Sequence, residues 1–173
     1  DAHMELAATR DGKVLAMRAH YVQDYGSYLQ MLTPLISQLT LLMSPGAYAI
    51  PEVDVTVTNV YTNTVPTDAL RGAGRPEATH AIERMMDILA LELGMSRTEV
   101  RRRNFPEEFP FTTAIGLMYD SGDYGKTLDR LLELSDSQAE FEKRREEAAG
   151  RGKLLGRGLS TWVEVCGFVP SDV

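Results

Sequence analysis

The chain has 173 residues, of which 43% are apolar and 25% charged, so it is long enough for about one folded domain and too apolar for a disordered one. A net charge of -7 argues against nucleic acid or an anionic membrane as the main partner, since either needs a basic surface. No apolar run reaches the roughly 20 residues of a membrane-spanning helix, so no membrane span is expected.

Two further features predict a cytoplasmic location. The first ten residues, DAHMELAATR, contain two acids and lack the apolar stretch of a signal peptide. The single cysteine, Cys166, cannot form an internal disulfide and fits a reducing compartment. Cys166 is interpreted as a small buried apolar residue rather than a nucleophile, because no His/Asp pair is arranged around it.

Sequence patterns in the first 60 residues predict mainly strands. The segments ELAATR and KVLAMRAHYV flank Asp11-Gly12, a dipeptide favoured in two-residue β-hairpin turns. Residues 29–43 are mostly apolar with scattered polar residues, which suits a buried segment. In VDVTVTNV, Val53, Val55 and Val57 alternate with polar residues, and this period of two predicts a half-buried strand.

Helices are predicted in the middle. Pro76 suits a first helical position and Gly94 the position just past the last one. Between them, apolar side chains recur at steps of three and four and predict a buried face: Ala78, Ile82, Met85, Met86, Leu89 and Leu93. SRTE at Ser96 predicts a capping box that opens a helix through Arg103.

The last third predicts two more helices and a strand. YDSGDYGKTLDRLLEL carries a leucine-rich helical pattern, and SQAE at Ser137 predicts a second capping box for a charged helix that stops near Gly150. GLSTWVEVCG alternates enough to predict a strand. The layout is α+β with mixed strands and helices, and residues 1–173 are taken as a single domain.

The segment TDALRGAGRPEATH lies on the predicted strand-to-helix loop. Gly72 and Gly74 allow a ligand to approach the backbone, and the first turn of a helix leaves N–H groups free to hold an anion. Arg71 and Arg75 add fixed positive charge and forked donors. An ordinary turn is the alternative, since Glu77 replaces the third glycine of GxGxxG and the GK[ST] ending of a P-loop is absent.

The motifs NTVPTDALRGAGRPEATHAIERMMDILALELG, VRRRNF, FPFTTAIGLMYDSGDY and GRGLSTWVEVCG occur in this order within residues 11–168, the first of them beginning at Asn63. Together they resemble the large, molybdopterin-binding subunit of the molybdenum hydroxylases, the family of xanthine dehydrogenase, aldehyde oxidase and carbon monoxide dehydrogenase. Large subunits of this family are several times longer than 173 residues. The resemblance therefore implies that the chain is an internal part of the molybdopterin-binding region of a larger catalytic subunit.

The resemblance also implies the site residues and cofactors. By position, the backbone amide of Arg71 would face the cofactor together with Gly72, while Gly72 and Ala73 would line the substrate pocket. The implied cofactor is molybdenum-molybdopterin, in its cytosine dinucleotide form. The implied partners are the rest of the large subunit and the subunits or domains that carry 2Fe-2S clusters and FAD.

Departures from family patterns narrow the substrate. Copper-containing carbon monoxide dehydrogenases place a cysteine where this chain has Gly72, and glycine offers no soft ligand. Purine-oxidising relatives place an aromatic residue where this chain has Ala73, and an arginine before the loop that residues 37–43 lack. An aldehyde or a related small carbonyl or heterocyclic compound is therefore the expected substrate.

The family reaction is a hydroxylation that takes its oxygen from water and passes electrons to the iron-sulfur clusters and FAD. Its glutamate base lies in a GxGE-like motif, which these 173 residues lack, so no catalytic residue is assigned. We expect the isolated fragment to be inactive and to retain no cofactor, because the other cofactor-binding segments are missing.

Three alternatives stay open: a carbon monoxide dehydrogenase homologue without the copper ligand, an independent anion- or nucleotide-binding module, and a noncatalytic assembly domain that pairs with another copy. Other conspicuous residues are given structural roles. His80 is expected to be structural or exposed, Asp120 and Asp123 to form turns and caps, and Glu164 to face solvent. The arginines of VRRRNF are expected to complement a helix dipole.

Overall fold

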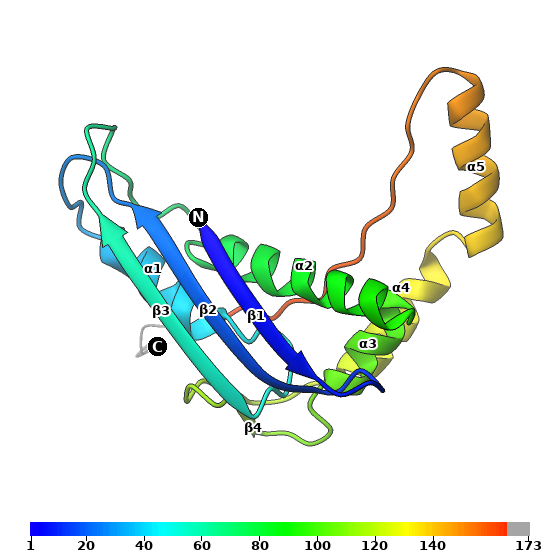
Figure 1. Cartoon of the computed structure of the whole chain (residues 1–173), viewed down its shortest axis with the longest axis horizontal. Coiled ribbons are helices and arrows are strands. Elements are labelled where there is room, and N and C mark those ends of the chain that lie inside the picture. The colour runs from blue at the N-terminus through cyan, green and yellow to red at the C-terminus, as the bar shows by residue number, and fades with distance from the viewer. Residues whose placement is uncertain (166–173) are drawn as a thin grey trace, which may run out of the picture.

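The computed structural model describes residues 1–165. Its elements in chain order are β1 (Ala2–Ala8), β2 (Val14–Asp24), α1 (Thr33–Met43), β3 (Glu52–Val60), α2 (Arg75–Leu93), α3 (Arg97–Asn104), β4 (Phe111–Thr112), β5 (Met118–Tyr119), α4 (Tyr124–Leu134) and α5 (Gln138–Gly150). The strands β1, β2 and β3 form one sheet in that order, and α1 and α2 cover one of its faces (Figure 1). Helix α4 packs beside α3, with Leu128 in the core, and α5 extends away from this body (Figure 1). The predicted α+β class is confirmed.

The hairpin of β1 and β2 is confirmed, but its turn is longer than the two residues predicted. The Thr9 N–H donates to the Lys13 carbonyl at 2.9 Å, and the Gly12 N–H donates to the Thr9 carbonyl at 3.0 Å. Gly12 has φ 89°, so the loop is a tight turn followed by a left-handed glycine, the usual three-residue hairpin connection.

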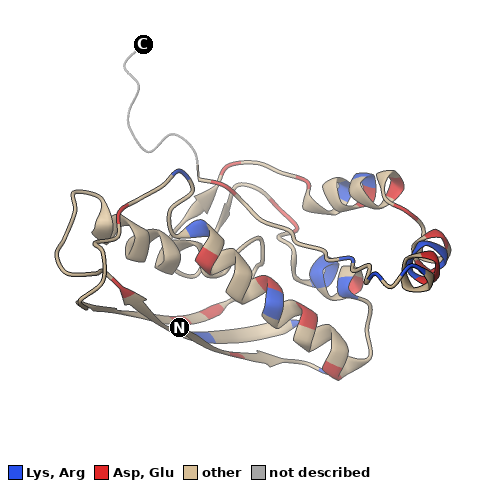
Figure 2. Ribbon diagram, turned by 90° about the horizontal axis from the view of Figure 1, so that it is seen from above, with Lys and Arg blue, Asp and Glu red and all other residues tan. Residues whose placement is uncertain are grey.

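The strands β2 and β3 are parallel, so the chain between them must cross over one face of the sheet. Helix α1 forms this crossover and lies on the same face as α2 (Figure 2). Residues 29–43 thus contain a helix, in which Pro34 occupies the first turn, where its missing N–H breaks no intrahelical bond. Leu39 and Met43 are buried, as the composition of this segment predicted.

The core lies between the sheet and α2. The inward side chains of β2 and β3 alternate with exposed ones, as the sequence predicted for β3. Ala78, Ile82 and Met86 of α2 are buried against them, and Gly94 closes the helix in the left-handed conformation. Glu83 on the same helix is also buried, which its sequence pattern did not predict.

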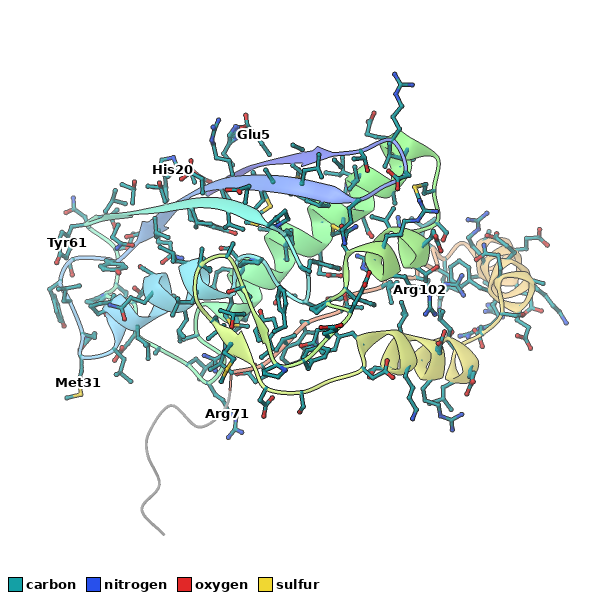
Figure 3. All side chains as sticks on the ribbon, turned by 90° about the horizontal axis from the view of Figure 1, so that it is seen from below. Glu5, His20, Met31, Tyr61, Arg71 and Arg102 are labelled. Atoms are coloured by element: carbon teal, nitrogen blue, oxygen red, sulfur yellow. The ribbon has the colours of Figure 1, made fainter. Side chains whose placement is uncertain are left out.

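The opposite face of the sheet is open and polar. Figure 3 shows Glu5 and His20 on this face, pointing away from the helices. Arg18 of β2 forms ion pairs across the strands with Glu5 at 3.3 Å and Asp54 at 3.4 Å. Within residues 1–165, the sheet therefore contributes to the core through one face only.

The predicted helix caps are largely confirmed. Ser137 and Glu140 form a complete capping box at α5. Ser96 caps α3 by accepting from the Glu99 N–H at 3.1 Å, but the Glu99 side chain bonds to Arg103 instead of completing the box. Basic and acidic residues are interspersed along α5 (Figure 2), as expected for a solvated helix.

The strand predicted at GLSTWVEVCG is wrong for the part that the structure describes. Residues 158–165 are extended but form no ladder, because no strand lies beside them. This segment returns from α5 to run along α2 (Figure 1), and its backbone bonds to side chains of the helices instead. Cys166 lies outside the described residues. Within residues 1–165, every helix is too short or too polar to cross a bilayer.

Candidate functional site

The loop before α2 makes two consecutive turns. The Ala73 N–H donates to the Leu70 carbonyl at 2.9 Å, and the Arg75 N–H donates to the Gly72 carbonyl at 3.0 Å. Gly72 has φ 96° and Gly74 has φ 78°, a region that L side chains rarely adopt. Helix α2 then begins with no side chain capping its first turn.

The two glycines of this loop serve different purposes. A Cβ on Gly74 would lie 2.4 Å from the Ile36 carbonyl oxygen and 2.6 Å from the Thr40 nitrogen, so this glycine lets the loop pack against α1. A Cβ on Gly72 would meet no atom of the described structure within 4 Å. Gly74 is therefore required by packing, whereas Gly72 leaves its backbone bare toward open space.

That open space is a cavity of about 790 Å³. One wall is the loop with the first turns of α2, and the other is the extended segment after α5. The lining residues are Arg71, Gly72, Arg75, Pro76, Thr79, Ser160, Trp162, Glu164 and Val165.

The predicted site residues occupy different positions around the cavity. Arg71 and Gly72 line it, and the exposed side chain of Arg71 points outward on the side of the molecule opposite the open sheet face (Figure 3). Ala73 is half-buried and contributes no atom to the lining within the described part of the chain. Whether these residues contact a cofactor or substrate stays a prediction.

An ion pair joins the two walls. The Arg75 guanidinium lies 2.5 Å from the Glu164 carboxylate, with side-chain exposures of 14% and 33%. Arg75 also donates to the Ala73 carbonyl at 3.4 Å. Glu164 is exposed, as expected, and its carboxylate also pairs with the cavity wall, because the extended segment runs against the start of α2.

Several hydrogen-bond donors at the cavity have no protein acceptor among residues 1–165. The N–H groups of Arg71 and Gly72 donate to no described group, and the Nε of Arg75 is buried without a partner there. The N-terminal end of α2 adds a partial positive charge. These donors and the bare backbone at Gly72 fit an oxygen-rich anionic group such as a pterin cofactor.

The described residues do not meet the requirements of a protein-ligated metal ion. Over residues 1–165, no three His, Cys, Asp or Glu side chains gather in a way that would hold a metal ion. The site as described could supply hydrogen bonds and shape to a metal cofactor.

A buried polar cluster lies behind the extended wall, and sequence patterns did not predict it. Arg101 of α3 is fully buried and donates to Glu83 of α2 through Nε at 3.0 Å and a terminal nitrogen at 2.8 Å. Glu83 also accepts from the Thr161 N–H at 2.9 Å and from the Tyr48 hydroxyl. The only sequence signal was a glutamate on the apolar face of a helix, opposite an arginine-rich helix end.

The charges within this cluster shift the pKa of its members. Burial, and then the negative charge of Glu83, raise the pKa of the Tyr48 hydroxyl well above its usual value. Burial by itself would lower the pKa of Arg101, but its interactions with Tyr48 and Glu83 outweigh burial and raise it. Arg101 is therefore cationic, and Tyr48 is a neutral hydrogen-bond donor.

The other arginines of VRRRNF also have carboxylate partners. Arg102 pairs with Asp129, and Arg103 lies 2.7 Å from Glu99. All three arginines of this run lie in the last turn of α3, as the helix-dipole interpretation predicted. Because each is paired with an acid, the run does not form a basic patch for nucleic acid.

The remaining candidates have the structural roles expected of them. His80 is exposed on α2. Asp123 caps α4 by accepting from the Lys126 N–H at 2.8 Å, and Asp120 accepts from the Ser121 N–H at 2.8 Å. These residues are explained by local hydrogen bonding.

Comparison with known proteins agrees with the resemblance. A family model described as a molybdopterin cofactor-binding domain matches residues 1–105. The carbon monoxide dehydrogenase large chain of Hydrogenophaga pseudoflava is 42% identical over 185 residues, which cover 100% of this chain and 23% of that protein. The nicotine 6-hydroxylase large subunit of Paenarthrobacter nicotinovorans is 35% identical, over 95% of this chain and 20% of that protein.

Solved structures of similar proteins also match this chain over part of their length. The quinoline 2-oxidoreductase of Pseudomonas putida 86 superposes with a TM-score of 0.78 and 36% identity, over 87% of this chain and 20% of that one. The chain thus spans about a fifth of the length of the relatives it matches, in agreement with the expectation that it is part of a larger subunit. The chain belongs to the molybdopterin cofactor-binding domain family of the molybdenum hydroxylase large subunits.

Proposed function

We propose that this chain forms one wall of the cofactor site in the catalytic subunit of a molybdenum hydroxylase. The observation that carries the proposal is the turn at Arg71 and Gly72, which presents free N–H groups and bare backbone to a 790 Å³ cavity at the start of α2. The cofactor, molybdenum-molybdopterin in its cytosine dinucleotide form, supplies the two-electron redox chemistry when bound.

In this proposal the residues of the chain bind and orient. The Arg71 and Gly72 amides donate to the cofactor, and Arg75, held by Glu164, adds a fixed positive charge beside them. The absence of a side chain at Gly72 leaves room for the substrate, with Ala73 on the substrate side. The base that takes the proton from water lies in parts of the subunit outside these residues.

The proposed substrate is an aldehyde or a related small carbonyl or heterocyclic compound, hydroxylated with oxygen from water. Relatives named for nicotine and quinoline support the heterocyclic class. The second candidate is carbon monoxide, favoured by the 42% identity to a carbon monoxide dehydrogenase large chain. Gly72 opposes it, because glycine cannot supply the thiolate that binds copper in those enzymes.

The remaining assignments belong to the same proposal. The partner subunits or domains carry 2Fe-2S clusters and FAD, which accept the electrons. The complex resides in the cytoplasm, as the lone cysteine at position 166 suggests.

The test uses the full-length subunit purified with its partners. Metal and pterin analysis is expected to find molybdenum and a cytosine dinucleotide without copper. Dye reduction with a panel of aldehydes, quinoline, nicotine and carbon monoxide then ranks the substrates, and product formed in ¹⁸O-labelled water is expected to carry the label. Absence of molybdenum, or product oxygen that comes from O₂, would overturn the proposal.

Variants of the loop test its proposed role. Arg71→Ala keeps the backbone amide and is expected to retain molybdenum, whereas Arg71→Pro removes that amide and is expected to lose it. Arg84→Ala is the control, since Arg84 is an exposed arginine on α2, the helix that follows the loop, and does not line this cavity. Equal molybdenum content and turnover in all three variants would remove Arg71 from the site.

A further inference from the structure

The extended wall of the cavity has few hydrogen bonds of its own. Over residues 158–165, no backbone group bonds to another backbone group of the described chain. The segment is attached through Leu159 and Thr161 to the cluster of Glu83 and Arg101, and through the ion pair of Glu164 with Arg75. Leu159 and Val163 also pack partly against the core.

The Glu83 carboxylate is the centre of this attachment. One oxygen accepts from both Arg101 nitrogens and from the Thr161 N–H, and the other accepts from the hydroxyls of Tyr48 and Thr161, the latter at 3.1 Å. The two carboxylate oxygens thus accept from five donors: two Arg101 nitrogens, the Thr161 N–H and the two hydroxyls. These donors fill the acceptor capacity of the carboxylate. Each donor is therefore held in one place by the others.

Arg101 completes the attachment from α3. It donates to the Leu159 carbonyl at 3.3 Å and to the Glu83 carbonyl at 3.2 Å, and it lies 3.0 Å from Asp87. Buried ion pairs of this kind often contribute little net stability relative to apolar packing, and in some proteins they select one geometry. Here the ion pair fixes the position of the segment around Thr161, which is 78 residues away from Glu83 in the sequence.

We propose that Glu83, together with Arg101, is a positioning residue that fixes segment 159–165 as the wall of the cavity opposite Arg71 and Gly72. Glu83 is buried and does not line the cavity, so it acts through Thr161 and the neighbours of Thr161. The identity of the cavity's ligand rests on the proposed function, whereas the attachment of the wall does not.

The experiment compares four forms of the full-length protein in its complex: wild type, Glu83→Gln, Thr161→Val and Asp129→Asn. Glu83→Gln removes the charge that pairs with Arg101. Thr161→Val removes only a hydroxyl and leaves the pair between α2 and α3 intact, so it decides the question if Glu83→Gln does not fold. Asp129→Asn is the control, because it removes an ion pair of the same chemistry, with Arg102, away from the cavity.

Two readouts are measured. Hydrogen exchange of the residue-161 amide, which donates to Glu83, is measured in protein prepared without molybdenum; it is expected to be about tenfold faster in the Glu83 and Thr161 variants and unchanged in the control. Molybdenum retained after gel filtration is expected to fall and KM to rise in the same two variants, with a smaller change in kcat.

Specific outcomes overturn the inference. Wild-type exchange of the residue-161 amide in every folded variant of Glu83 and Thr161, or faster exchange confined to α2 and α3 in Glu83→Gln, would show that the cluster does not hold the wall. Faster exchange with unchanged molybdenum retention and KM would show that it holds the wall but does not serve the site. A wild-type protein without molybdenum would refute the proposed function, while the exchange data would still test the attachment.

Discussion

The two glycines of the site loop provide the sharpest test of the packing argument. Gly74→Ala adds a methyl group 2.4 Å from the Ile36 carbonyl oxygen and 2.7 Å from Leu39 Cβ, at φ 78°. A positive φ costs an alanine about 1–2 kcal/mol, and an overpacked methyl about 1–3 kcal/mol, so we expect a loss near 3 kcal/mol. Gly72→Ala has the same backbone cost at φ 96° but no clash, so a loss of about 1 kcal/mol is expected.

Hydrogen exchange of α1 in the full-length protein measures this difference locally. A loss of 3 kcal/mol corresponds to about 100-fold faster exchange through local opening, and 1 kcal/mol to about fivefold. The two variants should also separate functionally, because a methyl on Gly72 enters the cavity and is expected to raise KM, with a smaller loss of stability than in Gly74→Ala. Equal acceleration of α1 exchange in both variants would refute the assignment of Gly74 to packing.

Three further predictions concern stability. Hydrogen bonds from the Gly26 N–H above all, and from nearby hydroxyls, lower the pKa of Asp24. Ionised Asp24 therefore stabilises the fold above pH 3.8, and this stabilisation is lost as pH falls through the folded pKa. Asp24→Asn should flatten the acid side of a profile of Tm against pH between about pH 2 and 6. The pKa of Tyr48 is raised, so the pH dependence runs the other way: neutral Tyr48 stabilises the fold below pH 10, and this stabilisation declines above pH 10. Between about pH 9.5 and 11, the Tm of Tyr48→Phe should fall less than the Tm of the wild type. Ser137→Ala removes half of a capping box and should weaken α5 by about 1 kcal/mol, seen as faster exchange in α5 alone.

Local sequence signals determined much of the fold. The turn at Asp11-Gly12 located the first hairpin, and Pro76 with Gly94 located both ends of α2 within a residue or two. Alternation in VDVTVTNV gave β3, and serine caps gave the starts of α3 and α5. These signals succeed because each depends on residues within about four positions of one another, where backbone conformation and capping are decided.

Family motifs in the sequence also placed Arg71 and Gly72, which the structure brings to one cavity. The motifs could not show that the two glycines have different structural roles. Gly72 and Gly74 look alike in RGAGR, and only the approach of α1 to the loop shows that one serves packing while the other faces open space.

Tertiary structure alone decided how the distant segments meet. The strand predicted near Trp162 failed because alternation reports which side chains are buried, but a strand also needs a neighbouring strand, and residues 158–165 have none in the described chain. Glu83, Arg101 and Thr161 carry no shared local signal, since their pairing depends on which faces of α2 and α3 turn toward the returning chain. The sequence thus determined the elements and the family, and the packing of those elements determined the cavity and the buried carboxylate behind it.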